Sequence, residues 1–157
     1  MTKTNAMRML ERAKIPYETA EYQYDEDNLS GVHAAEQITV IPPEHCFKTL
    51  VARGEHKGIV VFCIPVAAEL DMKAAAAAAG DKRVELIHVK ELPGLTGYVR
   101  GGCSPIGMKK KYPTYIDASA GQADRIGVSG GMRGLQVIVE PTKLAELVGA
   151  QFAAITR

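Results

Sequence analysis

The stretch CFKTLVARGEHKGIVVFCIPV, residues 46–66, decides the fold. Two runs rich in apolar and β-branched residues, 46–52 and 58–66, are separated by a polar segment that suits a hairpin connection. Residues 59–64 are apolar without a break, so both faces of the second strand should be covered by other parts of the chain. The stretch therefore predicts a hairpin whose second strand is buried on both faces.

Lys48 interrupts the first of these strands with a primary amine. Holding an ammonium group among apolar neighbours costs free energy unless a partner satisfies it. The side chain could reach the rim of the sheet, or it could pair with a carboxylate, the candidates being Glu36, Glu44 and Glu69. A catalytic or ligand-binding role is the other interpretation, and Lys48 alone does not decide between them.

The rest of the chain alternates short helices with short strands, without an internal repeat or a linker. Spacing and capping residues predict helices at residues 4–14 (capped by Thr2 or Thr4), 32–38 and 71–80, and from Pro141 onward. Strands are predicted at residues 17–24, 114–118, 125–129 and 135–140, with a strand or a short helix at 82–89. This order predicts an α/β fold with a mixed, largely antiparallel, barrel-like sheet flanked by helices.

The composition bounds the class of protein. With 157 residues, 24% charged and 46% hydrophobic, the chain fits one soluble globular domain, residues 1–157. The formal net charge of +1 does not indicate a nucleic-acid-binding protein, and no DNA partner is expected. The run Lys109–Lys111 is the densest positive spot, and it is typical of a solvated loop.

Cysteine usage and hydropathy point to a reduced compartment. Cys46, Cys63 and Cys103 are odd in number and widely spaced, so no disulfide framework, metal site or cofactor is predicted. The first ten residues are polar rather than a signal peptide, and the longest apolar run, 59–68, is too short to span a bilayer. We therefore expect a cytoplasmic protein without a membrane partner.

Two glycine-rich loops follow the strands, Gly101–Gly107 and Ser129–Gly134. Residues 102–109 nearly match a phosphate-binding P-loop, but the lysine falls one position late and no magnesium-binding hydroxyl follows it. Residues 127–131 match the G-x-S-x-G elbow of hydrolases, yet every histidine lies upstream of Ser129. Nucleotide hydrolysis is therefore rejected and a serine nucleophile is not expected. Residues 127–131 are typical of a tight hairpin turn, and this turn could also offer N–H groups to an anion.

Three segments in combination resemble a known family. They are Lys48-Thr49-Leu50, the Thr96-Gly97-Tyr98 lead into the first glycine loop, and the 128–134 turn. In this order and at this spacing they are similar to the YbaK-type deacylases, which are related to the editing domain inserted in bacterial prolyl-tRNA synthetases. The likeness extends from the first helix to Phe152–Ile155. It implies a mixed α/β domain in which helices flank a small barrel-like sheet.

The resemblance also implies an activity, trans-editing deacylation of aminoacyl-tRNA. In the YbaK-type branch the substrate is cysteine on tRNA(Pro). Cysteine is close to proline in size, and an apolar pocket discriminates against one methylene by only about 1–3 kcal/mol. The substrate thiol is understood to attack its own ester carbonyl, so that cysteine leaves as a cyclic thioester and no protein nucleophile is needed.

Carried over through the matching motifs, the resemblance assigns catalytic roles to Lys48, Gly101 and Gly102. The Lys48 ammonium would hold the 3′-end phosphate or the ester region of the aminoacyl-adenosine. The glycine backbone would approach the scissile carbonyl and aim an N–H at the developing oxyanion. Substrate-binding roles fall to Tyr22, Thr49, Ser129, Gly130, Arg133 and Gln136, with Ser129 and Gly130 at the adenosine and Arg133 at its phosphates.

Gln136 departs from the family pattern, because close relatives carry an aspartate there. Glutamine can accept and donate hydrogen bonds, but it has no charge. If the aspartate of the relatives helps to bind the amino group of the substrate, this chain should bind more weakly or with a different selectivity.

The leading hypothesis is therefore a Cys-tRNA(Pro) deacylase that acts on the acceptor end of aminoacyl-tRNA, together with prolyl-tRNA synthetase. A chain with a net charge of +1 should bind tRNA weakly without such a partner. The alternatives are a non-catalytic module that binds tRNA or the synthetase, a deacylase for another aminoacyl-tRNA such as Ala-tRNA(Pro), and a hydrolase of small esters.

Overall fold

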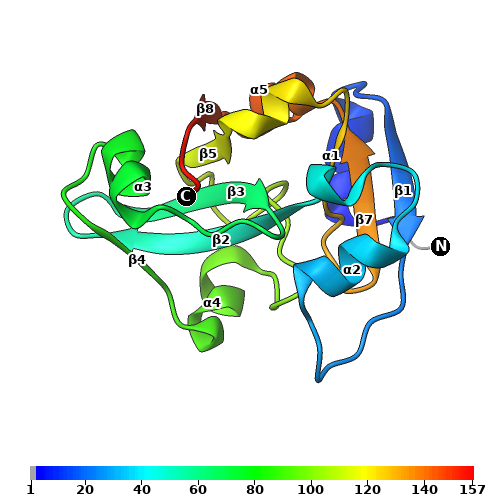
Figure 1. The fold of residues 1–157 in the computed structure, drawn as a ribbon, viewed down its shortest axis with the longest axis horizontal. Helices are drawn as coiled ribbons and strands as arrows, with labels where there is room; N and C mark the ends of the chain where they lie inside the picture. The colour runs from blue at the N-terminus through cyan, green and yellow to red at the C-terminus, as the bar shows by residue number, and fades with distance from the viewer. Residues whose placement is uncertain (1–2) are drawn as a thin grey trace.

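The structure is a computed structural model that describes residues 3–157 (Figure 1). Its strands are β1 (Tyr17–Glu21), β2 (Phe47–Gly54), β3 (Gly58–Pro65), β4 (Val84–Leu86), β5 (Thr114–Asp117), β6 (Ile126–Ser129), β7 (Leu135–Val139) and β8 (Gln151–Ala153). Its α-helices are α1 (Asn5–Arg12), α2 (Gly31–Gln37), α3 (Met72–Ala79), α4 (Leu92–Thr96) and α5 (Pro141–Val148). Short 3-10 turns lie at Pro43–His45, Val89–Glu91 and Ala118–Gln122.

The strands form two sheets that cross each other, as the directions of β7 and β2 in Figure 1 show. The large sheet has the order β4-β2-β3-β5-β8 and the small sheet the order β1-β7-β6. The predicted hairpin pairs β2 with β3, and the pairs β3–β5 and β5–β8 are parallel. The other pairs are antiparallel, which confirms the mixed, largely antiparallel fold flanked by helices. The sheets do not close into a barrel, because each keeps two edge strands.

The two sheets meet where β2 begins. A parallel bridge joins Cys46, just before β2, to Gly127 on β6. In the next positions along β2, Phe47 is buried in the core of the small sheet, whereas Leu50 packs against the core of the large one. The first residues of β2, which include Lys48, therefore lie where the two sheets contact each other.

Helices cover the sheets through faces that the sequence spacing predicts. Ala75 and Ala76 of the alanine-rich α3 are buried against the large sheet, where small side chains let the helix approach closely. Residues of α1 and α5 pack on the small sheet, namely Ala6, Met7, Leu10, Leu144, Ala145 and Val148. The apolar faces of both sheets are thus removed from water, which is the main favourable contribution to folding.

The predicted helix ends are confirmed where a cap determines them. The Asp71 carboxylate accepts hydrogen bonds from the N–H groups of Lys73 (3.1 Å) and Ala74 (3.0 Å) at the start of α3. Gly80 ends that helix with a φ of +68°, a conformation that favours glycine. Thr4 caps α1, whereas the alternative cap Thr2 lies outside the described residues. The segment 82–89 contains both predicted elements in part, β4 followed by the start of a 3-10 turn.

Candidate active site

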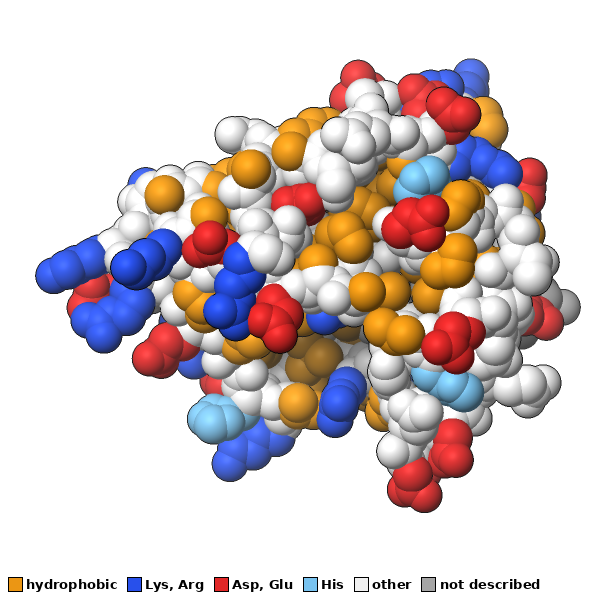
Figure 2. Space-filling view, viewed as in Figure 1, with side chains coloured by type: hydrophobic (Ala, Val, Ile, Leu, Met, Phe, Trp, Pro, Cys, Tyr) orange, Lys and Arg blue, Asp and Glu red, His pale blue; other side chains and the backbone are white. Residues whose placement is uncertain are grey.

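A cavity of about 430 Å³ lies where the start of β2 meets α2, the loop after α4 and the β6–β7 turn. On the face shown in Figure 2, hydrophobic side chains gather in a hollow between the surfaces of α2 and α4, with Lys or Arg side chains beside it. Among the described residues, the cavity lining includes His33, Lys48, Arg100 and Arg133 but no Asp or Glu. Such a lining favours an anionic ligand, because its positive charges are not neutralised from within the cavity.

The cavity brings together most of the predicted site residues from segments that are far apart in the sequence. Its lining contains Tyr22, Lys48, Thr49, Gly101, Ser129, Arg133 and Gln136. Gly102 and Gly130 are not in the lining, although each follows a residue that is. The three motifs of the sequence therefore meet in space at one hollow.

Lys48 reaches this cavity without an ion pair. None of the predicted partners holds it among residues 3–157, and Glu69 is instead paired with Arg157 at 2.6 Å. Burial lowers the pKa of the half-buried Lys48 ammonium, and the charge of Glu69 opposes this only in part. The ammonium is thus partly desolvated and available to a ligand.

The two glycines of the first loop differ in what they leave free. The Gly102 N–H donates to the Val99 carbonyl at 2.9 Å, and a Cβ on Gly102 would lie 3.0 Å from the backbone nitrogen of Arg133. The Gly101 carbonyl accepts a long hydrogen bond (3.5 Å) from the Tyr22 hydroxyl. The Gly101 N–H makes no hydrogen bond within residues 3–157. The absence of a side chain at Gly102 therefore allows the two loops to pack closely. The N–H of Gly101 remains available to donate a hydrogen bond to a ligand.

The second glycine loop is held by its own backbone. The Gly130 N–H donates to the Leu135 carbonyl at 2.9 Å, and the Thr4 hydroxyl donates to the Gly130 carbonyl at 2.6 Å. The Ser129 hydroxyl accepts from the Gly131 N–H at 3.1 Å. Gly130 therefore fixes the turn, and Ser129 is the residue that the turn presents to the cavity.

Tyr98 joins the two loops to each other. Its hydroxyl donates to the Ile106 carbonyl at 2.5 Å, and a Cβ on Gly131 would lie 3.3 Å from its ring. Burial raises the pKa of this phenol to about 12, so it remains a hydrogen-bond donor at any physiological pH. The Thr96-Gly97-Tyr98 lead into the first loop thus has a structural role at the site.

Gln136 is the most unusual group in the cavity. Its side chain is 5% exposed, and its Oε1 is a buried acceptor without a hydrogen-bond partner among the described residues. The neighbouring strand makes room for it, since a Cβ on Gly127 would lie only 2.5 Å from Oε1. Leaving such an acceptor unsatisfied costs about 1–3 kcal/mol. A hydrogen-bond donor that reached this oxygen would recover the free energy, but the atom itself exposes almost no surface and lies against Gly127.

Comparison with known proteins places this geometry in a family. The chain matches the family model described as the aminoacyl-tRNA editing domain over residues 26–147. It belongs to the aminoacyl-tRNA editing domain family. The matched part of this editing domain contains Lys48, both glycine loops and Gln136. The resemblance seen in the sequence motifs is confirmed.

A curated relative extends the likeness over nearly the whole editing domain. EbsC of Enterococcus faecalis, named as a Cys-tRNA(Pro)/Cys-tRNA(Cys) deacylase, is 49% identical over 154 residues, which are 98% of this chain and 93% of EbsC. Two crystal structures share the fold. One is a trans-editing enzyme for prolyl tRNA synthetase (TM-score 0.81, 23% identity, 99% of each chain), and the other is the hypothetical protein APE2540 (TM-score 0.81, 20% identity, 96% and 97% of the chains).

The cysteines of the editing domain are unsuited to act as nucleophiles. Burial raises the pKa of the thiols of Cys63 and Cys103 to about 12 and that of Cys46 to about 11. Because the thiolate is the reactive form, these groups are inert near neutral pH, even though Cys103 lines the cavity. The part of the chain that the structure describes holds no group of three or more His, Cys, Asp or Glu placed to bind a metal. Across residues 3–157, no helix has the length and apolar character needed to cross a membrane.

Sequence reasoning missed one wall of the cavity. The segment before α2, for which no element was predicted, contributes Asn28, Leu29 and Ser30, and α2 itself contributes His33. No motif marks these residues, because only the tertiary fold brings them to β2. Arg100 is a further omission, and its position directly before Gly101 was a usable signal.

Proposed function

We propose that this protein is a trans-editing deacylase that releases mischarged cysteine from tRNA(Pro). The observation that carries the proposal is the cavity, whose lining within residues 3–157 has no carboxylate and collects Lys48, Gly101, Ser129, Arg133 and Gln136 in one hollow. EbsC, named for deacylation of Cys-tRNA(Pro) and Cys-tRNA(Cys), supports this substrate class. The volume of about 430 Å³ lies within the usual range for pockets that enclose small ligands.

In this proposal the cavity holds the 3′-terminal aminoacyl-adenosine. The Lys48 ammonium attracts the terminal phosphate or the ester region, and Thr49 lines the same wall. Ser129 contacts the adenosine on the turn that Gly130 fixes, and Arg133 faces its phosphates. These contacts position the ester rather than transform it, and fixed geometry by itself accelerates acyl transfer strongly.

The chemical step uses the nucleophile of the substrate. The cysteine sulfur attacks the ester carbonyl, so that a C–S bond forms and the C–O bond to the 3′-oxygen breaks. The thiol proton passes to that 3′-oxygen, and cysteine leaves as a cyclic thioester. The Gly101 N–H is the donor available to the developing oxyanion, since the N–H of Gly102 is held by Val99. This step needs none of the buried thiols of the protein.

Gln136 is placed to bind the substrate amine. Its unpartnered Oε1 can accept one N–H from the α-amino group of the aminoacyl ester. An aspartate would attract an ammonium group through its charge, whereas a neutral carbonyl offers only a hydrogen-bond acceptor. Gln136 therefore orients the substrate amine, but it lacks the attraction that an aspartate carboxylate would add to binding.

The proposal also includes a partner protein and a cellular compartment. A net charge of +1 supports only weak binding to the whole tRNA, so we place the protein beside prolyl-tRNA synthetase, where mischarged tRNA is released. The setting is the cytoplasm, where the synthetase acts.

Release of amino acids from tRNA(Pro) by the purified protein tests the proposal. Cysteinyl-, seryl-, alanyl- and prolyl-tRNA(Pro) should be compared at equal concentrations, together with cysteinyl-tRNA(Cys). Cysteine should be released fastest, and serine much more slowly because its hydroxyl is a weaker nucleophile. Similar rates for cysteine and serine would contradict the substrate-assisted step, and alanine as the best substrate would change the assigned specificity.

A binding module is the second candidate, and the uncharged Gln136 is the observation that favours it. A protein of this kind would bind charged tRNA or the synthetase without accelerating release. Binding of Cys-tRNA(Pro) with loss of the ester no faster than in the absence of the protein would favour this candidate over the enzyme.

A further inference from the structure

A second groove, of about 490 Å³, continues from the cavity. The two hollows share Tyr22, Tyr24 and Arg133 in their linings. Six further residues line only the groove: Glu21, Gln23, Gln37, Met132, Gly134 and Leu135. The groove follows the end of β1 and the β6–β7 turn, so it adjoins the cavity at Tyr22, Tyr24 and Arg133.

Two half-exposed apolar side chains line the groove, Tyr24 and Met132. Tyr24 is 48% exposed and Met132 is 49% exposed. The Tyr24 ring is nevertheless held in place, because Gly134 has a φ of +83° and a Cβ on it would lie 3.1 Å from the ring. A ring supported by backbone on one side and open on the other is suited to stacking against a planar ligand.

The edge of the groove carries fixed hydrogen-bonding groups. The Gln37 side chain accepts from the Gln23 N–H at 2.9 Å and donates to the Gln23 carbonyl at 2.7 Å, which holds this edge together. Glu21 forms no ion pair within residues 3–157 and lines the groove with an unpaired carboxylate. A carboxylate accepts from the exocyclic amine of cytosine but repels the carbonyl that uracil has in its place.

Arg133 lies between the two hollows and is already oriented. Its Nε donates to the Arg100 carbonyl at 2.8 Å, and its Nη1 is 3.9 Å from the exposed carboxylate of Glu26. The remaining N–H groups of the guanidinium are free to bind an anion. A phosphate bound there would connect a nucleoside in the cavity to a second nucleoside in the groove.

We propose that the groove binds the nucleotide immediately 5′ to the terminal adenosine of the tRNA acceptor strand. Its base stacks on Tyr24 and Met132, its exocyclic amine meets Glu21, and the phosphate between the two nucleosides binds Arg133. This subsite rests on the proposed function, and it extends recognition from one nucleotide to two. The protein thereby reads single-stranded RNA at the acceptor end by stacking, a mode that does not need a high net charge.

Minihelices charged with cysteine test the subsite. Three substrates should differ only at the penultimate position, which carries cytosine, uracil or no base. For the unaltered protein, removal of the base should lower kcat/KM for release by about 10-fold, in the range that loss of one stacked base produces. For a Tyr24→Ala, Met132→Ala double variant, the same removal should change kcat/KM by less than about 2-fold, because the stacking partner is gone.

Two further variants make the result specific. Leu86→Ala removes another exposed apolar side chain, 50% exposed on β4, and it should keep the full dependence on the base. Glu21→Gln should abolish the preference for cytosine over uracil. If removal of the base costs the unaltered protein and the double variant equally, the subsite is wrong even though deacylation is observed.

Binding separates failure of the subsite from failure of the enzyme. Fluorescence anisotropy with uncharged minihelices measures binding without any chemical step. If no substrate is deacylated but binding still weakens on base removal only when Tyr24 and Met132 are present, the proposed function fails and the groove stands. If binding is also independent of the base, the groove proposal is overturned.

Discussion

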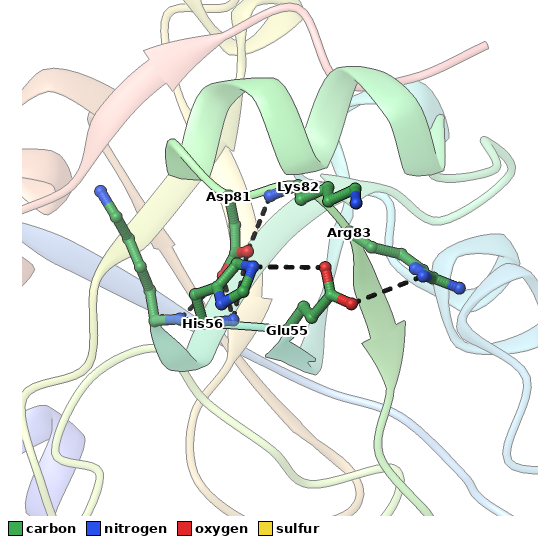
Figure 3. A network of polar contacts seen from close by, with 6 residues as sticks. Glu55, His56, Asp81, Lys82 and Arg83 are labelled. Carbon is green, nitrogen blue, oxygen red and sulfur yellow. Dashed lines mark hydrogen bonds and ion pairs between the residues drawn. The ribbon is translucent and has the colours of Figure 1, made fainter.

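The tip of the β2–β3 hairpin and the cavity at the start of β2 differ in whether their polar groups have hydrogen-bond or ion-pair partners. At the tip, the Asp81 carboxylate accepts hydrogen bonds from the backbone N–H groups of Lys82 (2.7 Å), Lys57 (2.8 Å) and His56 (3.2 Å) (Figure 3). Glu55 adds contacts with Arg83 at 3.5 Å and with His56 at 3.4 Å. The groups at this end of the hairpin therefore satisfy one another.

At the other end of the same hairpin, polar groups lack partners. Lys48 has no ion pair among the described residues, and the buried Oε1 of Gln136 has no hydrogen bond. The Gly101 N–H is likewise unused within residues 3–157. We infer from this contrast that the hairpin tip contributes to stability, and we propose that the unsatisfied groups of the cavity contact a substrate. Changes in the cavity should then harm activity and spare stability, and changes at the tip should do the reverse.

The largest effect is expected for Lys48→Met, which keeps the length of the side chain and removes its charge. Release of cysteine from Cys-tRNA(Pro) should fall by at least about 100-fold, the scale on which loss of one charge-stabilising group acts. The melting temperature should stay the same or rise by roughly 2–4 °C, the change that about 1 kcal/mol produces in a chain of this length. Single-turnover kinetics and thermal unfolding measure the two effects.

Lys82→Ala is the matched control, because it removes an exposed lysine whose backbone N–H still binds Asp81. The pH dependence gives a further check. The folded protein holds the pKa of Lys48 below 10.5, so the unfolded chain binds more protons in the window just under that pH. The free energy of unfolding of the wild type, measured relative to that of Lys48→Met, should therefore rise with pH through that window. Full deacylase activity in Lys48→Met would remove the basis of the site.

A smaller loss of activity is expected for Gln136→Leu. The change removes a buried acceptor that has no partner and replaces it with an apolar group of similar size. The melting temperature should be maintained or raised, since an unsatisfied group is lost. The KM for Cys-tRNA(Pro) should increase about 10-fold, because one hydrogen bond to the substrate amine disappears. An unchanged KM would show that Oε1 does not meet the substrate.

Asp81→Asn should reverse this pattern by lowering stability and leaving deacylation unchanged. The backbone N–H of Lys57, followed by those of His56 and Lys82, lowers the pKa of the Asp81 carboxyl from 3.8. Its stabilising contribution is therefore complete above pH 3.8 and is lost as the pH falls through the lower pKa of the folded state. The melting temperature of the variant should be lower than that of the wild type at pH 7, and the gap should narrow in acid.

The smallest effect is expected for Cys103→Ala. This thiol lines the cavity, but burial raises its pKa to about 12 and keeps it protonated. Release of cysteine should change by less than about 3-fold, because a thiol that stays protonated is a poor nucleophile. A loss as large as that of Lys48→Met would indicate a covalent intermediate on the protein.

Local features of the fold could be predicted from the sequence, because local physics determines them. The hairpin follows from two apolar runs around a polar segment, and α3 follows from an Asp71 cap, an alanine run and Gly80. Whether the barrel-like sheet closes could not be predicted, since closure depends on which edge strands find partners. That choice is made by long-range contacts, such as the bridge from Cys46 to Gly127.

The candidate site likewise has features that the sequence predicts and features that only the fold determines. Lys48 could be noticed because a charge in an apolar strand violates the local pattern. The isolation of Gln136 Oε1 could not, since it depends on the β6–β7 register and on the space beside Gly127. The roles of Gly101 and Gly102 also could not be separated, because only the bond from Gly102 to Val99 distinguishes them.

The most direct measurement is a crystal structure with a non-hydrolysable analogue, 3′-deoxy-3′-cysteinylamino-adenosine. We expect the analogue to occupy the cavity with its amine within hydrogen-bond distance of Gln136 Oε1 and its carbonyl oxygen facing the Gly101 N–H, beside Lys48. An analogue bound with its amino acid outside this cavity, or with these three groups still without partners, would show that the site is wrong.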